Sequence, residues 1–275
     1  MSPAGELIVA ERGDSALVLV DYGGSIEFAG DTDVTDYHSP LGSDVLGLCA
    51  EMAASLAVGT RLNLDSLPAE GAKLVEEALI ATGFSTTLTE HDVAMVLKLP
   101  ASAEGYYDMI GKKDRHELRR KRRRYQAEVG EVVVATDRGR ETGSEGFAIE
   151  EFIRLHRLSE GKKGSFMTPE REGFFRRLAR QPGWRVDYLV ADGKATACLF
   201  AWCDRDTYYL YNSSYDPELQ SASPGLVALA AVIENSIETG LRYFDFLKGS
   251  EGYKARLGGR SRPLIRIEAV AGGRK

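Results

Sequence analysis

The chain has 275 residues, 43% of them apolar, and a net charge of −6 at neutral pH, which suits a globular protein of one large or two modest domains. No apolar run approaches the ~18–20 residues that would span a membrane, and the first residues lack the basic and apolar regions of a signal peptide. We therefore expect a cytoplasmic protein with no membrane span.

The charge is unevenly distributed along the chain. Residues 112–124, KKDRHELRRKRRR, contain nine basic and two acidic side chains, a local charge of +7, so the remainder carries −13. A basic strip on an acidic body needs a local explanation. The three cysteines and four histidines show no metal-ligand spacing, so we expect reduced thiols and no metal site.

Residues 1–108 alternate between strand and helix patterns. Short apolar runs with turn residues between them predict strands, and longer runs with helical spacing predict helices. The predicted strands cover residues 5–11, 16–22, 25–30, 61–67 and one or two segments of 86–100, and the predicted helices cover 43–56 and 69–82. This is an α/β half with mixed strand pairing.

The next segment begins with the basic helix, predicted over residues 114–129. Asp114 and Glu117 have the spacing of a capping box, and Gly130 ends the helix. A strand at 131–136, a helix at 147–159 and a Gly/Lys-rich loop at 160–167 follow. Thr168 then caps a further helix that has Pro169 at its first position.

From Trp184 onward the pattern predicts a meander of antiparallel strands. Asp192-Gly193 is a strong two-residue hairpin signal between the runs 184–191 and 194–202. A third strand includes YYLYN at 208–212. A helix then begins at Ser223-Pro224-Gly225, and strands follow at 241–249 and 263–270.

The start of that helix is a candidate phosphate site. Serine at the N-cap, Pro224 next and the small Gly225 leave free backbone N–H groups approachable, with Leu226 beside them. Such a helix end, with its positive dipole, binds phosphate readily. The alternative is a capped helix with no ligand.

The segment after this helix supplies candidate catalytic residues. Asp245 lies among aromatic side chains, which can raise the pKa of a carboxyl and suit it as a general base. Lys254 could hold phosphate or polarise an acyl carbonyl, and Glu251 is a weaker candidate for base or amine recognition. The alternatives are a structural acid and a surface lysine in a turn.

Further candidates lie on the meander and near the Gly/Lys-rich loop. The polar tips of Tyr211 and Asn212 could donate to an acyl oxygen or protonate a leaving thiolate, although YYLY also reads as an ordinary aromatic strand. Lys163 and Phe166 could border an acceptor pocket, together with Tyr253 beside Lys254.

Several segments together resemble the CelD-like acetyltransferases of the GNAT superfamily. The resemblance is carried by YNSSYDPELQSASPG, ETGLRYFDFLKGSEGYK and the basic helix KKDRHELRRKRRRYQAEVG. It implies a tandem GNAT-like α/β (α+β) fold with two mixed, mostly antiparallel sheets and flanking helices. Residues 1–108 would be a partial GNAT-like half and 109–275 the acyltransferase domain, with acyl-CoA as co-substrate.

The resemblance leaves three functions open. The first is transfer of an acyl group from acyl-CoA to an amine of a small molecule or sugar. The second rests on similarity to the FemAB transferases, which use aminoacyl-tRNA, and on Arg119 and Arg123 of the basic helix as phosphate-binding residues. The third is a non-catalytic module that binds nucleic acid or protein. The acceptor, the acyl group and the oligomeric state stay open.

Overall fold

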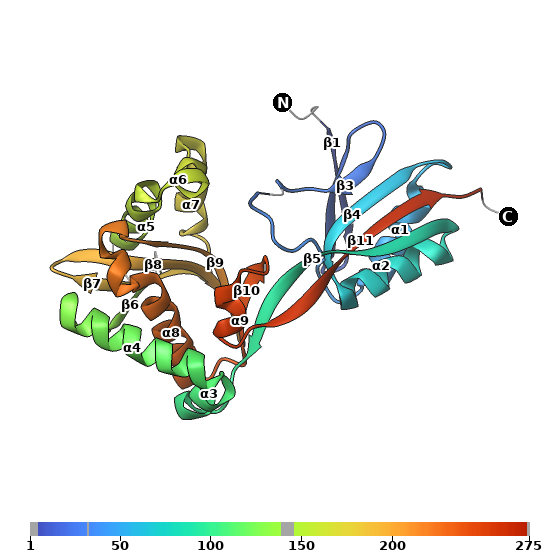
Figure 1. The fold of residues 1–275 in the computed structure, drawn as a ribbon. Helices are drawn as coiled ribbons and strands as arrows, with labels where there is room; N and C mark the ends of the chain where they lie inside the picture. Colours follow the sequence, from blue (N-terminus) through green and yellow to red (C-terminus); the bar gives the residue numbers. More distant parts are fainter. Residues whose placement is uncertain (1–4, 32, 139–145, 274–275) are drawn as a thin grey trace. The chain divides into compact units, whose positions relative to one another are not determined.

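The structure is a computed structural model that describes residues 5–31, 33–138 and 146–273 (Figure 1). The chain forms two compact units. The first comprises Met1–Ala94, Lys248–Ser250 and Ser261–Lys275, and the second comprises Met95–Leu247 and Glu251–Arg260.

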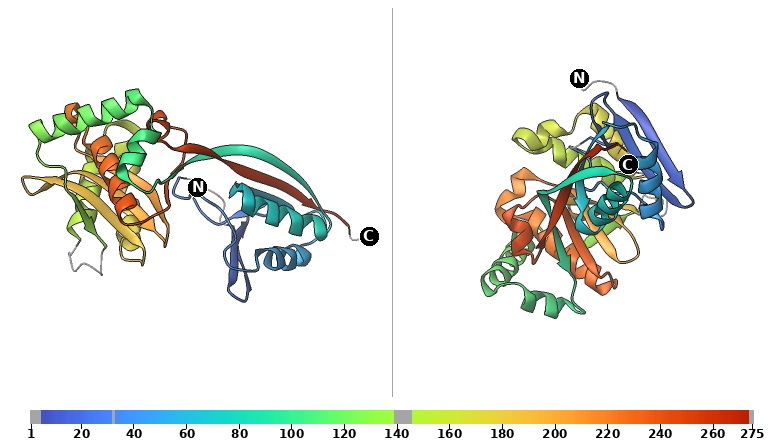
Figure 2. Two further views of the ribbon diagram at one scale, coloured as in Figure 1. Left: turned by 90° about the horizontal axis from the view of Figure 1, so that it is seen from below. Right: turned by 90° about the vertical axis from the view of Figure 1, so that its right-hand side faces the viewer.

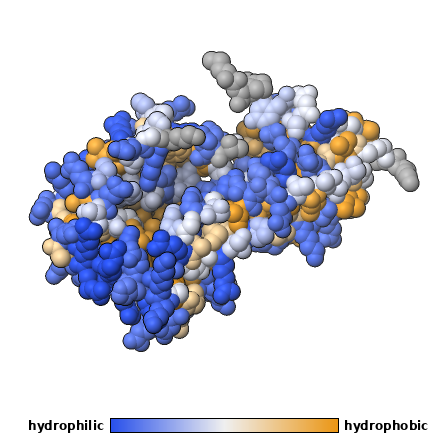
Figure 3. All heavy atoms as spheres, viewed as in Figure 1, coloured by the Kyte–Doolittle hydropathy of each residue, from blue (hydrophilic) through white to orange (hydrophobic). Residues whose placement is uncertain are grey.

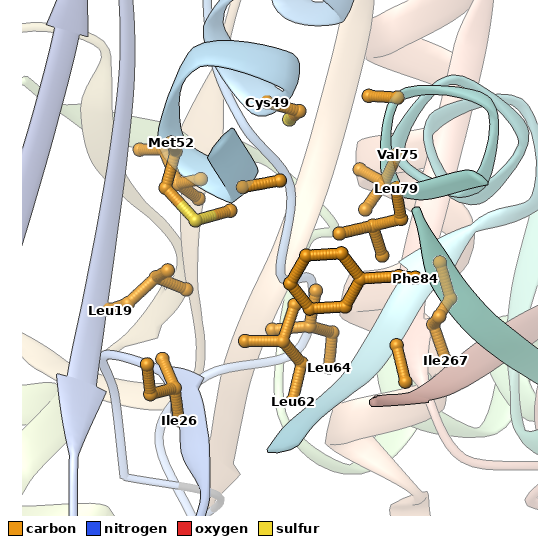
Figure 4. Packing of buried hydrophobic residues seen from close by; sticks show 14 of the residues in the cluster. Leu19, Ile26, Cys49, Met52, Leu62, Leu64, Val75, Leu79, Phe84 and Ile267 are labelled. Carbon is orange, nitrogen blue, oxygen red and sulfur yellow. The ribbon is translucent and has the colours of Figure 1, made fainter. Parts of the chain in front are cut away.

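The first unit packs two helices on one face of its strands. Its elements are β1 (Glu6–Arg12), β2 (Ser15–Asp21), β3 (Ile26–Phe28), α1 (Val45–Ser55), β4 (Arg61–Pro68), α2 (Ala69–Ala81), most of β5 (Phe84–Lys98) and most of β11 (Arg260–Ala271). Cys49 and Met52 of α1 and Val75 of α2 point toward Leu62 and Ile267 of the strands (Figure 4). This apolar cluster is the core of the first unit.

The second unit is a meander of strands covered by helices on both faces. Its remaining elements are α3 (Ala103–Met109), α4 (Lys112–Glu128), β6 (Val134–Asp137), α5 (Phe147–Leu158), α6 (Gly161–Phe166), α7 (Pro169–Leu178), β7 (Trp184–Ala191), β8 (Lys194–Cys203), β9 (Thr207–Tyr215), the 3-10 helix η2 (Pro217–Ala222), α8 (Pro224–Glu238), β10 (Tyr243–Lys248) and α9 (Gly252–Arg256). Figures 1 and 2 both show α4 and α8 side by side, and these helices contact each other.

Strand β8 shows why both faces are covered. Cys198 and Phe200 pack against α5 and α7, while Ala197 packs against α4 and α8. Successive side chains of a strand point to opposite faces, so a strand that is buried on both sides reads as a continuous apolar run. That is the pattern of KATACLFAW in the sequence.

The strands pair in the order β1-β2-β3-β4-β11-β5-β10-β9-β8-β7-β6 as an 11-stranded sheet. The α/β class and the flanking helices are confirmed, but the expected division into two sheets is wrong. The physical reason is strand length. With 15 residues, β5 begins at Phe84 in the first unit and ends at Lys98 in the second, so one strand belongs to both.

The compact units also divide the chain elsewhere than the predicted boundary between residues 108 and 109. Residues 95–108 belong to the second unit. The last strand returns to the first unit, because β11 pairs antiparallel with β4, from Leu264 opposite Pro68 to Val270 opposite Arg61.

One predicted helix start and one predicted loop differ in the structure. α4 begins at Lys112 after Gly111 and has no side-chain cap, and Asp114 instead accepts a hydrogen bond from Arg256 Nε at 2.9 Å. The segment 160–167, predicted as a loop, contains the short helix α6. The predicted cap of α7 is confirmed, since Thr168 Oγ1 accepts from Arg171 N and Pro169 is the first helical residue.

Candidate active site

The start of α8 lies against the end of β9. We predicted that the Ser223 side chain caps the helix, and this is wrong. The 3-10 helix η2 runs directly into α8 and leaves Ser223 with a φ of 56°. Pro224 is the first helical residue, as predicted. A Cβ added to Gly225 would lie 3.1 Å from Tyr215 Cδ1, so glycine allows the first turn of α8 to approach β9 closely.

Strands β9 and β10 pair only near their beginnings. Their parallel register comprises Tyr243–Thr207, Phe244–Tyr208 and Asp245–Tyr209. β9 then continues to Tyr215 and β10 to Lys248. The start of α8 therefore meets β9 beyond the last residue pair that β9 shares with β10.

A bulge in β9 re-aims Tyr211. Phe200 of β8 pairs with Asn212 and Ala201 pairs with Leu210, which leaves Tyr211 as an extra residue. A bulge bends the strand and changes the direction of its side chains. The Tyr211 ring lies edge-on to Trp184 with centroids 5.2 Å apart, so it belongs to the aromatic core around α5 and α7.

Helix α6 brings Lys163 to the same end of β9. The Lys163 ammonium lies 5.4 Å from the centre of the Tyr215 ring, and burial lowers its pKa. The Phe166 ring lies 5.6 Å from that of His156. The structure thus groups the predicted residues Lys163, Phe166 and Asn212 around the buried His156.

His156 is a residue whose importance the sequence did not reveal. It lies on α5 and is 1% exposed. Burial and the nearby Lys163 charge lower its pKa to about 4, and a hydrogen bond with the side chain of Asn212 opposes that shift. His156 is therefore neutral at physiological pH. Because a lone histidine on a helix carries no signal of its neighbours, only the fold could identify it.

The second group of predicted residues lies at the end of β10. Asp245 is 1% exposed, and its Oδ1 accepts a hydrogen bond from the N–H of Leu247 at 2.7 Å. Lys254 is 3% exposed, and its Nζ donates to the carbonyl oxygen of Leu247 at 3.4 Å. Leu247, with a φ of 58°, thus connects the two charged side chains.

Glu251 gives Lys254 a carboxylate partner. Its Oε2 lies 2.9 Å from Lys254 Nζ, and its side chain is 58% exposed. The pair joins a buried ammonium to a carboxylate that water can reach. Such a pair can pass a proton to solvent more readily than Asp245, which is enclosed.

A small hollow lies between α4, α8 and α9. Leu226 of α8 and Tyr253 of α9 line it together with Leu118 of α4 and Arg256. Burial raises the pKa of Tyr253 to about 12, so its hydroxyl stays protonated at physiological pH. Two residues predicted on separate grounds, Leu226 and Tyr253, therefore share one surface.

The arginines of the basic helix α4 have different roles. Arg122 donates two hydrogen bonds to Glu234 of α8, at 2.8 and 2.7 Å, and so holds the two helices together. Arg119 lies over the Tyr107 ring at 5.3 Å. Arg123 is exposed and makes no ion pair within the part of the chain that the structure describes. Hydrophilic residues dominate the surface in this region (Figure 3).

Comparison with known proteins identifies the family of the chain. The family model described as "Acetyltransferase (GNAT) domain" matches residues 112–255. This is more than half of the chain and includes α4, the meander, α8 and Lys254. The chain belongs to this GNAT acetyltransferase domain family. No curated protein matches it in sequence.

Solved structures share the fold of this GNAT protein at low sequence identity. The C-terminal domain of a candidate lysylphosphatidylglycerol synthetase from Agrobacterium fabrum is 13% identical, with a TM-score of 0.62 over 99% of this chain and 85% of that one. L-PGS from Bacillus licheniformis is 10% identical, with a TM-score of 0.58 over 98% and 85%. FemX is 10% identical, with a TM-score of 0.58 over 96% and 87%.

Two further observations concern metal binding and membrane-spanning helices. Within the described residues, no three His, Cys, Asp or Glu side chains are grouped so that they could hold a metal ion. No described helix has the length and apolar character needed to cross a membrane.

Proposed function

We propose that this GNAT protein is an N-acyltransferase that moves an acyl group from acyl-CoA to an amine. The observation that carries the proposal is the contact between Gly225 and Tyr215, at the part of β9 that no longer pairs with β10. A helix start with free N–H groups is suited to phosphate, and the thioester would lie beside the adjoining end of β9.

The chemistry needs a nucleophile, a proton acceptor and a group that stabilises developing charge. The acceptor's amine nitrogen attacks the acyl carbonyl carbon, the carbon–sulfur bond breaks, and the amine's proton passes to a carboxylate. Asp245 or Glu251 would take this proton, directly or through water. Lys254 or Tyr211 would stabilise the carbonyl oxygen or the leaving thiolate.

The remaining predicted residues would bind the two substrates. The donor phosphates would lie against residues 223–226, with Asn212 directed at the acyl group. The acceptor amine would lie near Lys163, Phe166 and Tyr253. Because Lys163 loses part of its affinity for a proton through burial, binding of an anion beside it would restore that affinity.

The proposal is tested with a thermal-shift panel of acyl-CoAs against the wild type and Gly225→Val. A ligand at a hundred times its Kd should add about 2.7 kcal/mol to the free energy of unfolding. Valine at 225 would crowd Tyr215 and cover the first turn of α8, so the shift should disappear. Gly173→Ala, in α7, serves as the matched control. Failure of every acyl-CoA to stabilise the wild type would contradict the proposal.

A second candidate is transfer of an aminoacyl group from aminoacyl-tRNA. Exposed cations of α4 without ion-pair partners among the described residues, such as Arg123 and Lys112, favour it, as does the fold shared with FemX. Arg119→Glu combined with Arg123→Glu should then abolish tRNA binding, and wild-type binding should fall steeply with salt. A wild-type protein that does not retain charged tRNA at low salt would exclude this candidate.

A further inference from the structure

A second hollow lies between α4 and α9, and it is strongly basic. Five cationic side chains line it, and these are Lys112, Lys113, Arg115, Arg119 and Arg256. His116 and Glu117 complete the lining. We refer to this surface as the basic hollow.

Glu117, the one carboxylate among the residues that line the basic hollow, is paired with cations outside it. Glu117 accepts two hydrogen bonds from Arg120, at 2.8 and 2.7 Å, and Lys121 Nζ lies 3.9 Å away. Neither Arg120 nor Lys121 lines the hollow. The Glu117 carboxylate is therefore engaged outside the hollow and does little to offset the cations within it.

Three of the five cations have no carboxylate partner within residues 5–31, 33–138 and 146–273. Arg115 pairs with Asp108 at 2.8 Å, and Arg256 pairs with Asp114 at 2.9 Å. Lys112, Lys113 and Arg119 make no such pair, although the Arg119 guanidinium lies over the Tyr107 ring. Like charges gathered on one face repel one another unless an anion joins them.

The spacing of three of the lining side chains puts them on one helix face. Lys112, His116 and Arg119 recur at intervals of four and three residues, which aligns them along α4. Tyr107 holds the Arg119 side chain from one side and is itself hydrogen-bonded to Glu234 of α8. Part of the basic hollow is thus tied to the helix whose start faces β9.

The basic hollow adjoins the proposed donor site. Arg256 lines it and also lines the small hollow that contains Leu226, the second residue after Pro224 at the start of α8. The two hollows therefore share Arg256, and Asp114, which pairs with Arg256, also lines the small one.

We infer that the basic hollow binds a nucleotide phosphate of the acyl donor, additional to the phosphate that faces the start of α8. The inference rests on the proposed function and assigns α4 to donor recognition. For a CoA donor this group is the phosphomonoester on the ribose. For an RNA donor it is a backbone phosphodiester. Lys112, Lys113 and Arg119, which pair with no carboxylate among the described residues, supply charge-assisted hydrogen bonds to either group.

The test measures binding by calorimetry, without turnover. CoA and dephospho-CoA, which lacks the ribose phosphate, are titrated into the wild type, the double variant Lys113→Ala/Arg119→Ala, and Arg124→Ala. Arg124 lies on the same helix, pairs with Glu128 and is outside the basic hollow. The wild type and Arg124→Ala should bind CoA at least about tenfold tighter than dephospho-CoA. The double variant should bind both equally.

An RNA minihelix provides the second arm. If the double substitution weakens RNA binding while CoA and dephospho-CoA do not bind the wild type, the phosphate in the basic hollow comes from RNA. If the wild type binds CoA and dephospho-CoA equally tightly, or the double variant keeps their ratio, the inference is wrong while the proposed CoA donor stands. If neither CoA nor RNA binds the wild type, the proposed function fails and the inference fails with it.

Discussion

The carboxylate of Asp245 accepts a hydrogen bond from the backbone N–H of Leu247, two residues further along β10, at 2.7 Å. Leu247 has a φ of 58°, in the left-handed region, which costs a non-glycine residue roughly 1–2 kcal/mol. Asp245 therefore helps to stabilise the left-handed backbone of Leu247, whose carbonyl group meets Lys254. The same carboxylate that we propose as a base also shapes the site, and substitutions can separate these two roles.

Asp245→Asn tests the charge of this residue with its shape retained. The amide oxygen can still accept from Leu247 N–H, so the free energy of unfolding should change by less than about 1 kcal/mol. If the carboxylate takes the proton of the amine, acyl transfer should fall by about 10²–10⁴-fold. Initial rates and thermal unfolding are measured together. Asp245→Ala, which removes the acceptor, should also lose stability. Wild-type rates for Asp245→Asn would remove Asp245 from the mechanism.

Lys254→Met tests the buried ammonium. Methionine fills a similar volume, and the Glu251 carboxylate left behind is 58% exposed and stays hydrated, so the fold should survive. If Lys254 stabilises charge on the acyl oxygen or leaving group, kcat should fall by about 10²–10³-fold. Steady-state kinetics with saturating donor give kcat directly. Lys194→Met, at the start of β8, is the matched surface control. A change confined to KM would instead make Lys254 a binding residue.

The pH dependence of the free energy of unfolding should reveal the protonation of His156. Its pKa is about 4 in the folded protein, against about 6.5 for an unperturbed histidine. Because the pKa of His156 is lower in the folded than in the unfolded protein, the folded state is fully stable with respect to this residue above pH 6.5. The free energy of unfolding then decreases as the pH falls toward 4. From these two values the loss between pH 8 and pH 5 is about 2 kcal/mol.

Denaturant unfolding at pH 8 and pH 5 measures this loss. His156→Gln should show a smaller decrease than the wild type, whereas His116→Gln, at an exposed position of α4, should behave as the wild type. Equal decreases in the wild type and His156→Gln would show that His156 does not titrate in this range.

Two glycines in the second unit should respond oppositely to alanine. Gly193 has a φ of 73° in the β7–β8 hairpin and an added Cβ would touch nothing within 4 Å, so Gly193→Ala should cost roughly 1–2 kcal/mol of stability through backbone strain alone. Gly173 lies within α7, where alanine is favoured by roughly 0.5–1 kcal/mol. Chemical denaturation of both variants compares them. A Gly193→Ala protein as stable as the wild type would contradict the strained-turn description.

Local sequence signals determined most of the elements. Asp192-Gly193 predicted the hairpin between β7 and β8, and both residues have positive φ in the structure. Thr168-Pro169 predicted the start of α7, and Pro224 the first residue of α8. These signals are reliable because they act within one turn of chain, where the backbone has few allowed conformations. Ser223 failed as a side-chain cap because η2, immediately before it, imposes a different backbone conformation.

Tertiary structure alone decided which residues lie together. The sequence placed Asp245 and Lys254 in one segment, but they meet through the left-handed backbone of Leu247, which accompanies a hydrogen bond from its N–H to the Asp245 side chain. His156 and Lys163 come from α5 and α6, and Asn212 from β9, so their grouping exists only in the fold. Local pattern specifies helices and strands because their bonds join near neighbours. The burial and the pKa of a site residue, and the pairing of the cations of α4, depend instead on residues distant in the chain.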